Sequence, residues 1–236
     1  MATNEILTAR KHRIEHRLKE RGIHNYTIKY LPYLEFDSSE FATAREIGIR
    51  MIVLSQVAYV PHEIEAGPRI KAWLEAENLW TYVTQKEKKL FEGEITDART
   101  MINFSWEVES AYTLAWCVNL IPSLHEPINP LDDDQIELFV SKMFTVDPNP
   151  IYNIIPFLTS PLERYLRKLT LRNPEEIFEE NIVNELATTY FRDIMISQKK
   201  NESDINIPVS FQRHKALNWV RRFEGITDWD HVDTST

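Results

Sequence analysis

Two residues of the stretch RHKALNWV, His214 and Asn218, are well suited to chemistry because they lie four positions apart. In a helix this spacing puts both side chains on one face. An imidazole titrates near neutral pH, so His214 is a candidate general base or metal ligand. Alternatively, both side chains hydrogen-bond the C-terminal tail, because buried polar groups need partners. We favour this second role, since a metal site needs further ligands that the sequence does not place.

The tail carries two further carboxylates, Asp228 and Asp230, on either side of Trp229. Carboxylates at alternating positions can bind a hard cation such as Mg²⁺ or Ca²⁺. The segment lacks the glycine and the final glutamate of an EF-hand loop, however. We therefore expect Trp229 to enter the core while the two aspartates cap turns or helix N-termini. The tail would then act as a structural lock.

Glu109 is the carboxylate whose position is most informative. It follows Trp106 by three residues and precedes Thr113 by four, in a segment rich in apolar side chains. A buried carboxylate either pairs with a cation or has a raised pKa and becomes a candidate acid or base. We favour an ion pair with a basic residue such as Arg213 or Arg45.

These side chains define the candidate site predicted from the sequence. An enzyme, either hydrolase-like or metal-dependent, would need the imidazole and the carboxylates to converge at a hollow that water reaches. The polar candidates are Glu109, His214, Asn218, Asp228 and Asp230, and the aromatic lining candidates are Trp106, Trp219 and Trp229. We expect no bound cofactor and no metal.

The elements that position these residues are predicted to be helices. Two capping boxes, Thr43 with Glu46 and Thr84 with Glu87, each mark a helix start. The longest helical pattern spans 95–120 and has two apolar faces, so it predicts a central helix buried on both sides. Asn173-Pro174 and Ser160-Pro161 each have the N-cap and N1 residues of a helix, and a final helix is expected over about 209–223.

Two stretches depart from helical periodicity. Residues 23–36 are β-branched and aromatic, and we expect extended chain there with room for one short edge strand. Pro122, Pro127 and Pro130 mark an internal joint near 122–131. The prediction is an all-α fold, a single helical domain over 1–236 arranged around the buried central helix.

The composition excludes several classes of function. Only five glycines occur and no two are close together, so no phosphate-binding glycine loop can be formed. Cys117 is the single cysteine, which excludes an intramolecular disulfide and a multi-cysteine zinc site. The net charge of −9 makes nucleic-acid binding unfavourable. No apolar run reaches the roughly 20 residues of a membrane span, and no signal peptide is present, so a cytoplasmic location is expected.

Several stretches of the chain resemble one family. SFQRHKALNWV and ITDWDHVDTST near the C-terminus, with NFSWEVESAYTLAWCVNLI upstream, resemble the bacterial domain of unknown function 4272. ATAREIGIRMIVLSQVAYV and KAWLEAENLWTYVTQKEKKLF are similar to it in order and spacing. Glu107 stands where the family pattern has a basic residue. The resemblance implies a helical intracellular domain and no particular activity.

Two functions follow from these observations. The first is a non-enzymatic interaction or ligand-binding domain, whose partner is another protein or a small molecule. It accords with the absence of catalytic motifs and with an aromatic content of 11%. The second is the enzyme described above, which uses the Glu/His/Asp cluster. The enzyme requires that Glu109, His214 and Asp230 converge at one site, and the binding domain does not.

Overall fold

The computed structural model describes residues 3–143 and 162–234, which form helices and connecting loops with no strand among them. Its all-α class agrees with the prediction from the sequence. The α-helices are α1 (Asn4–Glu20), α2 (Ala44–Tyr59), α3 (Gly67–Ala76), α4 (Gln85–Phe91), α5 (Ala98–Ser105), α6 (Glu107–Cys117), α7 (Asp133–Met143), α8 (Leu162–Leu166), α9 (Pro174–Ser197) and α10 (Ile207–Val220). Short 3-10 helices are η1 (Leu31–Leu34), η2 (Ser38–Glu40), η3 (Ile64–Ala66), η4 (Trp80–Tyr82), η5 (Phe223–Gly225) and η6 (Trp229–His231).

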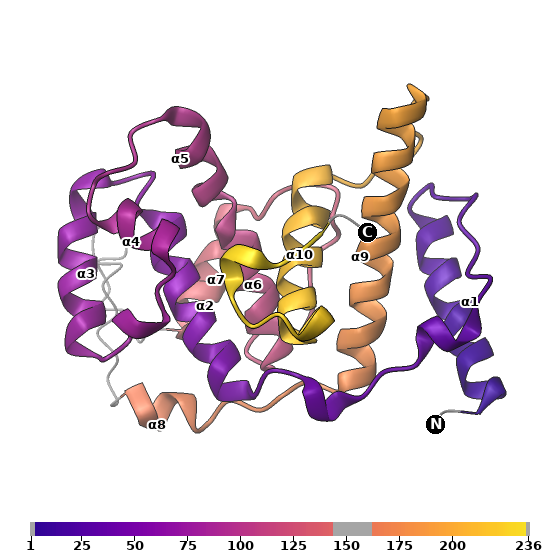
Figure 1. Ribbon diagram of the computed structural model, residues 1–236, viewed down its shortest axis with the longest axis horizontal. Coiled ribbons are helices and arrows are strands. Elements are labelled where there is room, and N and C mark those ends of the chain that lie inside the picture. The colour runs from indigo at the N-terminus through magenta and orange to yellow at the C-terminus, as the bar shows by residue number, and fades with distance from the viewer. Residues whose placement is uncertain (1–2, 144–161, 235–236) are drawn as a thin grey trace.

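Five helices pack side by side in the order α1, α9, α10, α6, α2 (Figure 1). Helices α3 and α4 pack together beyond α2, and α8 contacts α2. The residues after α10 run across the row as a C-terminal tail (yellow in Figure 1). Buried apolar side chains from α1 through η6 form one contiguous core.

Local signals explain where several helices begin. Both predicted capping boxes are present: the Thr43 hydroxyl accepts from the Glu46 N–H and the Glu46 side chain accepts from the Thr43 N–H, and Thr84 and Glu87 do the same. The Asn173 side chain caps α9 by accepting from the Glu175 N–H. Residues Ser160-Pro161 lie outside the described part of the chain.

The expected edge strand near the N-terminus is wrong. Pro32 lies in the first turn of η1, where its fixed φ suits a helical turn and its missing N–H is not needed. The chain around η1 is extended but pairs with no other segment as a strand within 3–143 and 162–234.

The predicted central helix over 95–120 is two helices, so this expectation needs correction. Trp106 ends α5 and precedes α6, at backbone angles that remain helical. No residue of α5 is buried, whereas ten of the eleven residues of α6 are. Burial on both sides therefore belongs to Glu107–Cys117 alone. The internal joint near 122–131 and the single-domain assignment stay predictions.

No helix within the described ranges is both long and apolar enough to span a membrane.

Candidate functional site

The C-terminal tail is held on the helical row by Trp229. Its side chain is 3% exposed, and its indole packs edge-on against Trp219 with ring centroids 5.8 Å apart. The Trp219 Nε1–H donates to the carbonyl of Thr227 at 2.8 Å. Trp229 thus fills a core position, as the sequence predicted, and Trp219 fixes the turn that leads to it.

Two cations lie over the Trp229 ring. The guanidinium of Arg50 is 5.0 Å and the ammonium of Lys215 is 4.6 Å from the ring centroid. Lys215 pairs with Glu107 at 2.7 Å, and the Trp229 Nε1–H makes a long 3.5 Å hydrogen bond to the same carboxylate oxygen. Cation–π attraction is strongest where water is excluded, so these contacts stabilise the tail in its position.

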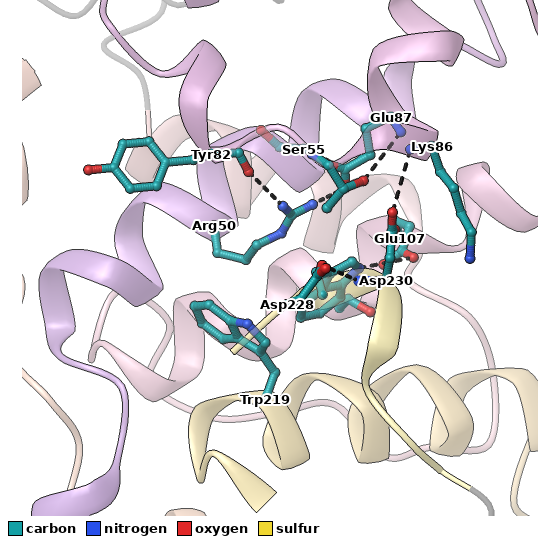
Figure 2. Close-up of polar contacts among 12 residues, drawn as sticks. Arg50, Ser55, Tyr82, Lys86, Glu87, Glu107, Trp219, Asp228 and Asp230 are labelled. Atoms are coloured by element: carbon teal, nitrogen blue, oxygen red, sulfur yellow. Dashed lines mark hydrogen bonds and ion pairs between the residues drawn. The ribbon is translucent and has the colours of Figure 1, made fainter. Parts of the chain in front are cut away.

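Arg50 and Glu87 form a buried ion pair beside the tail (Figure 2). The side chain of Arg50 is 5% exposed and that of Glu87 is 2% exposed. Arg50 Nη2 donates to the Glu87 carboxylate and Nη1 donates to the carbonyl of Tyr82 at 3.1 Å. Glu87 also caps α4, because its carboxylate accepts from the Thr84 N–H at 2.9 Å. The pair therefore joins α2 to the start of α4.

A hollow of about 500 Å³ lies where α2, η4 and the start of α4 meet the end of α10 and the tail. We call it the tail hollow. It is lined by residues within 46–50, 81–88, 219–222 and 227–231. Its walls include four of the residues singled out from the sequence: Trp219, Asp228, Trp229 and Asp230.

The two aspartates make polar contacts at the wall of the tail hollow. Asp228 caps η6 by accepting from the Asp230 N–H at 3.0 Å, and it contacts the His231 ring at 2.8 Å. Slight burial raises the pKa of Asp228, but these hydrogen bonds outweigh it and lower the pKa below its usual value. Asp230, by contrast, makes a long-range contact: it accepts from the Lys86 N–H in the first turn of α4 at 3.5 Å, and so joins the tail to α4 (Figure 2).

His214 and Asn218 lie behind the tail, in a buried polar network between α9 and α10. Asn218 Nδ2 donates to His214 Nε2 at 3.0 Å and to the carbonyl of Asp233 at 2.8 Å, and its Oδ1 accepts from Asn181 at 2.9 Å. His214 Nδ1 contacts the Thr188 hydroxyl at 3.1 Å. Burial lowers the pKa of His214 to about 4. The imidazole is therefore neutral, and both of its nitrogens are engaged.

Glu109 lies in a separate cluster with residues of the 122–131 loop. Its Oε1 accepts from the Leu131 N–H at 2.6 Å, and its Oε2 is 3.6 Å from Nε2 of His125. Burial raises the pKa of Glu109, and the charge of Arg213 opposes that rise. Neither cation considered from the sequence forms an ion pair with Glu109 among the described residues: Arg213 lies beyond ion-pair distance, and Arg45 pairs with Glu163 at 2.6 Å.

The candidate residues thus occupy three places: the tail hollow, the His214 network and the Glu109 cluster. Among the residues of 3–143 and 162–234, no hydrogen bond or ion pair joins Glu109, His214 and Asp230 to one another. No three His, Cys, Asp or Glu side chains in these ranges come together as a metal-binding group. Trp106 is partly exposed at the junction of α5 and α6.

Sequence reasoning missed Arg50, Glu87 and His125 as members of these clusters. Arg50 carried a usable signal, because it is the one charge inside an apolar run over 47–60 and a buried cation needs a partner. His125 carried none, since it lies in a proline-rich loop without periodicity.

Comparisons with known proteins agree with the family resemblance. A family model described as Domain of unknown function (DUF4272) matches residues 10–232. The match confirms the resemblance expected from the sequence. Searches of curated proteins and of solved structures gave no significant match.

Proposed function

We propose that this chain, which belongs to the family described as Domain of unknown function (DUF4272), is a non-enzymatic cytoplasmic binding domain whose ligand lies in the tail hollow. The observation that carries the proposal is the hollow itself, about 500 Å³ in volume beside the buried Trp219–Trp229 pair. This volume is within the range of small-molecule sites, roughly 300–1,000 Å³.

The lining of the tail hollow favours a polar ligand of little net charge. Both signs of charge line it: the carboxylates are Glu46, Asp228 and Asp230, and the cations are Lys88, Arg222 and Arg50, the last already paired with buried Glu87. The hydroxyls of Thr81 and Thr84 add donors and acceptors. The charged groups of a zwitterionic metabolite could each pair with a lining residue of opposite sign, and a neutral polar metabolite could hydrogen-bond both kinds of residue. A strongly charged metabolite would be repelled by the lining residues that share its sign.

The alternative is a hydrolase-like or metal-dependent enzyme that uses Glu109, His214, Asn218, Asp228 and Asp230. Such an enzyme needs its acid or base within hydrogen-bond reach of a substrate that water also reaches. Only the two aspartates line the tail hollow. Glu109 is 1% exposed and His214 is fully buried with both ring nitrogens in contact with protein groups, so the arrangement supports binding over catalysis.

A thermal-shift screen of polar metabolites and divalent metals tests this function, because a ligand that binds only the folded state raises the unfolding midpoint. The blocking variant is Gln85→Trp, since Gln85 is exposed and lines the tail hollow. The matched control is Lys89→Trp, exposed on the same helix but outside the hollow.

We expect a polar metabolite to raise the midpoint of the wild-type chain and of Lys89→Trp, and to have no effect on Gln85→Trp. Equal stabilisation of both variants would place the ligand elsewhere. Chemical turnover of the bound compound, followed by mass spectrometry, would contradict the non-enzymatic role. If no compound stabilises the chain, the proposal of a small polar ligand in the tail hollow is wrong.

A further inference from the structure

The structure has a second hollow, of about 570 Å³. It is bounded by the end of α1, the start of α9, the 122–128 loop and α10. Four arginines line it, Arg17, Arg21, Arg172 and Arg213, and we call it the arginine hollow. None of the residues predicted from the sequence as a site lines it.

Arg213 is the most unusual of the four. It is 1% exposed, and burial lowers its pKa. A guanidinium has five N–H donors, yet among the described residues the side chain of Arg213 makes one hydrogen bond, from Nη2 to the carbonyl of His125 at 2.7 Å. Its Nε is buried without a partner. No carboxylate of the described residues lies within ion-pair distance of it. Buried charged donors are costly to leave unpaired, so this side chain lacks acceptors that a ligand would supply.

Arg172 is fixed in advance at the wall of the arginine hollow. It donates to the carbonyls of Trp116 at 2.8 Å, Ile121 at 3.0 Å and Pro122 at 3.2 Å, and its guanidinium lies 4.6 Å from the centre of the Trp116 ring. A cation held in this way loses little conformational entropy when a ligand binds.

Arg21 is held only by a weak ion pair. Its partner Glu126 is 3.3 Å away and the Glu126 side chain is 71% exposed, so water already solvates that carboxylate. Exposed ion pairs contribute little to stability and are easily exchanged. Arg21 can therefore turn to a bound anion at small cost.

The carboxylates of the arginine hollow are arranged by depth. Glu180, paired with Arg17, is the one buried carboxylate among the lining residues. Burial raises the pKa of Glu180, but the charges of Arg17, Arg213 and Arg21 outweigh it and bring the pKa to about 2. The other four carboxylates of the lining belong to exposed residues, Glu20, Glu126, Glu176 and Asp204, and Glu176 pairs with Arg172 at 3.1 Å. Arg17, Arg21 and Arg172 are therefore already paired, and Arg213 is the one lining arginine without an ion-pair partner among the described residues.

We propose that the arginine hollow binds the phosphate group of a small phosphorylated metabolite. Arginines approach it from α1, from the residue that precedes the α9 cap and from α10, three separate directions. The three terminal oxygens of a phosphate monoester can accept from all of them, whereas a flat carboxylate offers two oxygens in one plane. The site is distinct from the tail hollow, and no residue lines both.

The test uses inorganic phosphate as the probe, titrated into the full chain at constant ionic strength. Isothermal titration calorimetry measures the affinity, and the arginine Nε–H signals in a ¹⁵N–¹H NMR spectrum identify the site without any substitution. Arg21→Gln removes one donor, and the ion pair that it breaks, to the exposed Glu126, is of a kind that contributes little to stability. The matched control is Arg69→Gln, because Arg69 is half exposed and its contact to Glu63 is 3.7 Å long.

We expect phosphate to shift the Arg213 Nε–H signal, and Arg21→Gln to weaken phosphate binding about tenfold, the factor for loss of one charge-assisted hydrogen bond. Arg69→Gln and Gln85→Trp should bind phosphate as the wild-type chain does. An unmoved Arg213 signal, or equal weakening by Arg69→Gln, would overturn the proposal. Acetate binding as tight as phosphate binding would overturn the phosphate assignment. Because Gln85 lines only the tail hollow, failure here is distinguishable from failure of the proposed function.

Discussion

The amide of Asn218 donates a hydrogen bond to Nε2 of His214 at 3.0 Å, which determines the tautomer of a fully buried imidazole. Nε2 must be the acceptor, so the proton is on Nδ1. Nδ1 then donates to the Thr188 hydroxyl, whose own proton goes to the carbonyl of Asn184 at 2.8 Å. A proton added to Nε2 would break the contact with Asn218, so the network requires neutral His214.

We therefore expect acid to destabilise the chain through His214. The pKa of His214 is about 4 in the folded chain, whereas in the unfolded chain it has its ordinary value of 6.5. Between pH 4 and pH 6.5, the unfolded chain therefore binds more protons than the folded chain. The stabilisation is complete above pH 6.5 and is lost as the pH falls toward 4. Integrated from pH 7 to pH 5, the loss is about 2 kcal/mol. Urea unfolding at both pH values measures it.

The variant His214→Gln separates this effect from other titrating groups. At pH 7 it should lose about 1–3 kcal/mol, because Asn218 and Thr188 are left without their partner. Its further loss between pH 7 and pH 5 should be about 2 kcal/mol smaller than that of the wild-type chain. His231→Gln is the control, since His231 is 75% exposed and should keep the full pH dependence. An unchanged pH dependence in His214→Gln would show that other groups cause it.

Glu87 and Glu46 occupy the same position in two capping boxes but differ in burial. The Glu87 side chain is 2% exposed and pairs with buried Arg50, whereas that of Glu46 is 39% exposed and pairs with Arg222. We expect Glu87→Gln to cost about 3–5 kcal/mol, because glutamine keeps the cap but leaves Arg50 as an uncompensated buried charge. Glu46→Gln should cost less than about 1 kcal/mol. Similar losses in chemical denaturation would contradict a special role for the buried pair.

Trp229 should determine whether the tail stays on the row. Trp229→Ala should cost about 3–5 kcal/mol, the range for removing a buried aromatic side chain. Trp229→Phe should cost less, because a ring still faces Trp219 and the two cations. Trp106→Ala is the comparison, since Trp106 is only partly buried. Denaturation that affects Trp106→Ala and Trp229→Ala equally would show that the tail contributes little.

Gly22 and Gly93 distinguish backbone strain from steric overlap. Both have positive φ, +80° and +73°. A Cβ at Gly22 would lie 2.6 Å from the carbonyl oxygen of Glu202, whereas one at Gly93 would meet nothing within 4 Å. Gly93→Ala should cost about 1–2 kcal/mol from the left-handed conformation alone. Gly22→Ala should cost clearly more, and equal unfolding midpoints for the two variants would contradict the overlap.

Much of the helical fold is predictable from sequence because its signals are local. The capping boxes at Thr43 and Thr84 place the starts of α2 and α4, since the four residues involved are adjacent in the chain. The break at Trp106 is not predictable in this way. Its residues favour helix on both sides, and what differs is tertiary: α6 is enclosed while α5 is largely exposed.

The candidate site is harder to predict, because it depends on contacts between distant residues. His214 and Asn218 meet as expected, since their spacing of four is a helical property. Asp228 caps its own turn as the sequence indicated. The division of the candidates among three places could not be foreseen. It depends on how α6 and α10 rotate against their neighbours, and hydrophobic periodicity determines that rotation poorly when a helix is apolar on every face.

The position of α1 at the end of the row has a consequence for biosynthesis. Its arginines Arg10 and Arg13 pair with Glu175 and Glu179 of α9, more than 160 residues later in the chain. Helix α1 is therefore synthesised well before the helix with which its arginines pair. At about 5–20 residues per second this interval is on the order of ten to thirty seconds. During that time the face of α1 that packs on α9 lacks its native cover, so this segment of the nascent chain is open to chaperones and proteases.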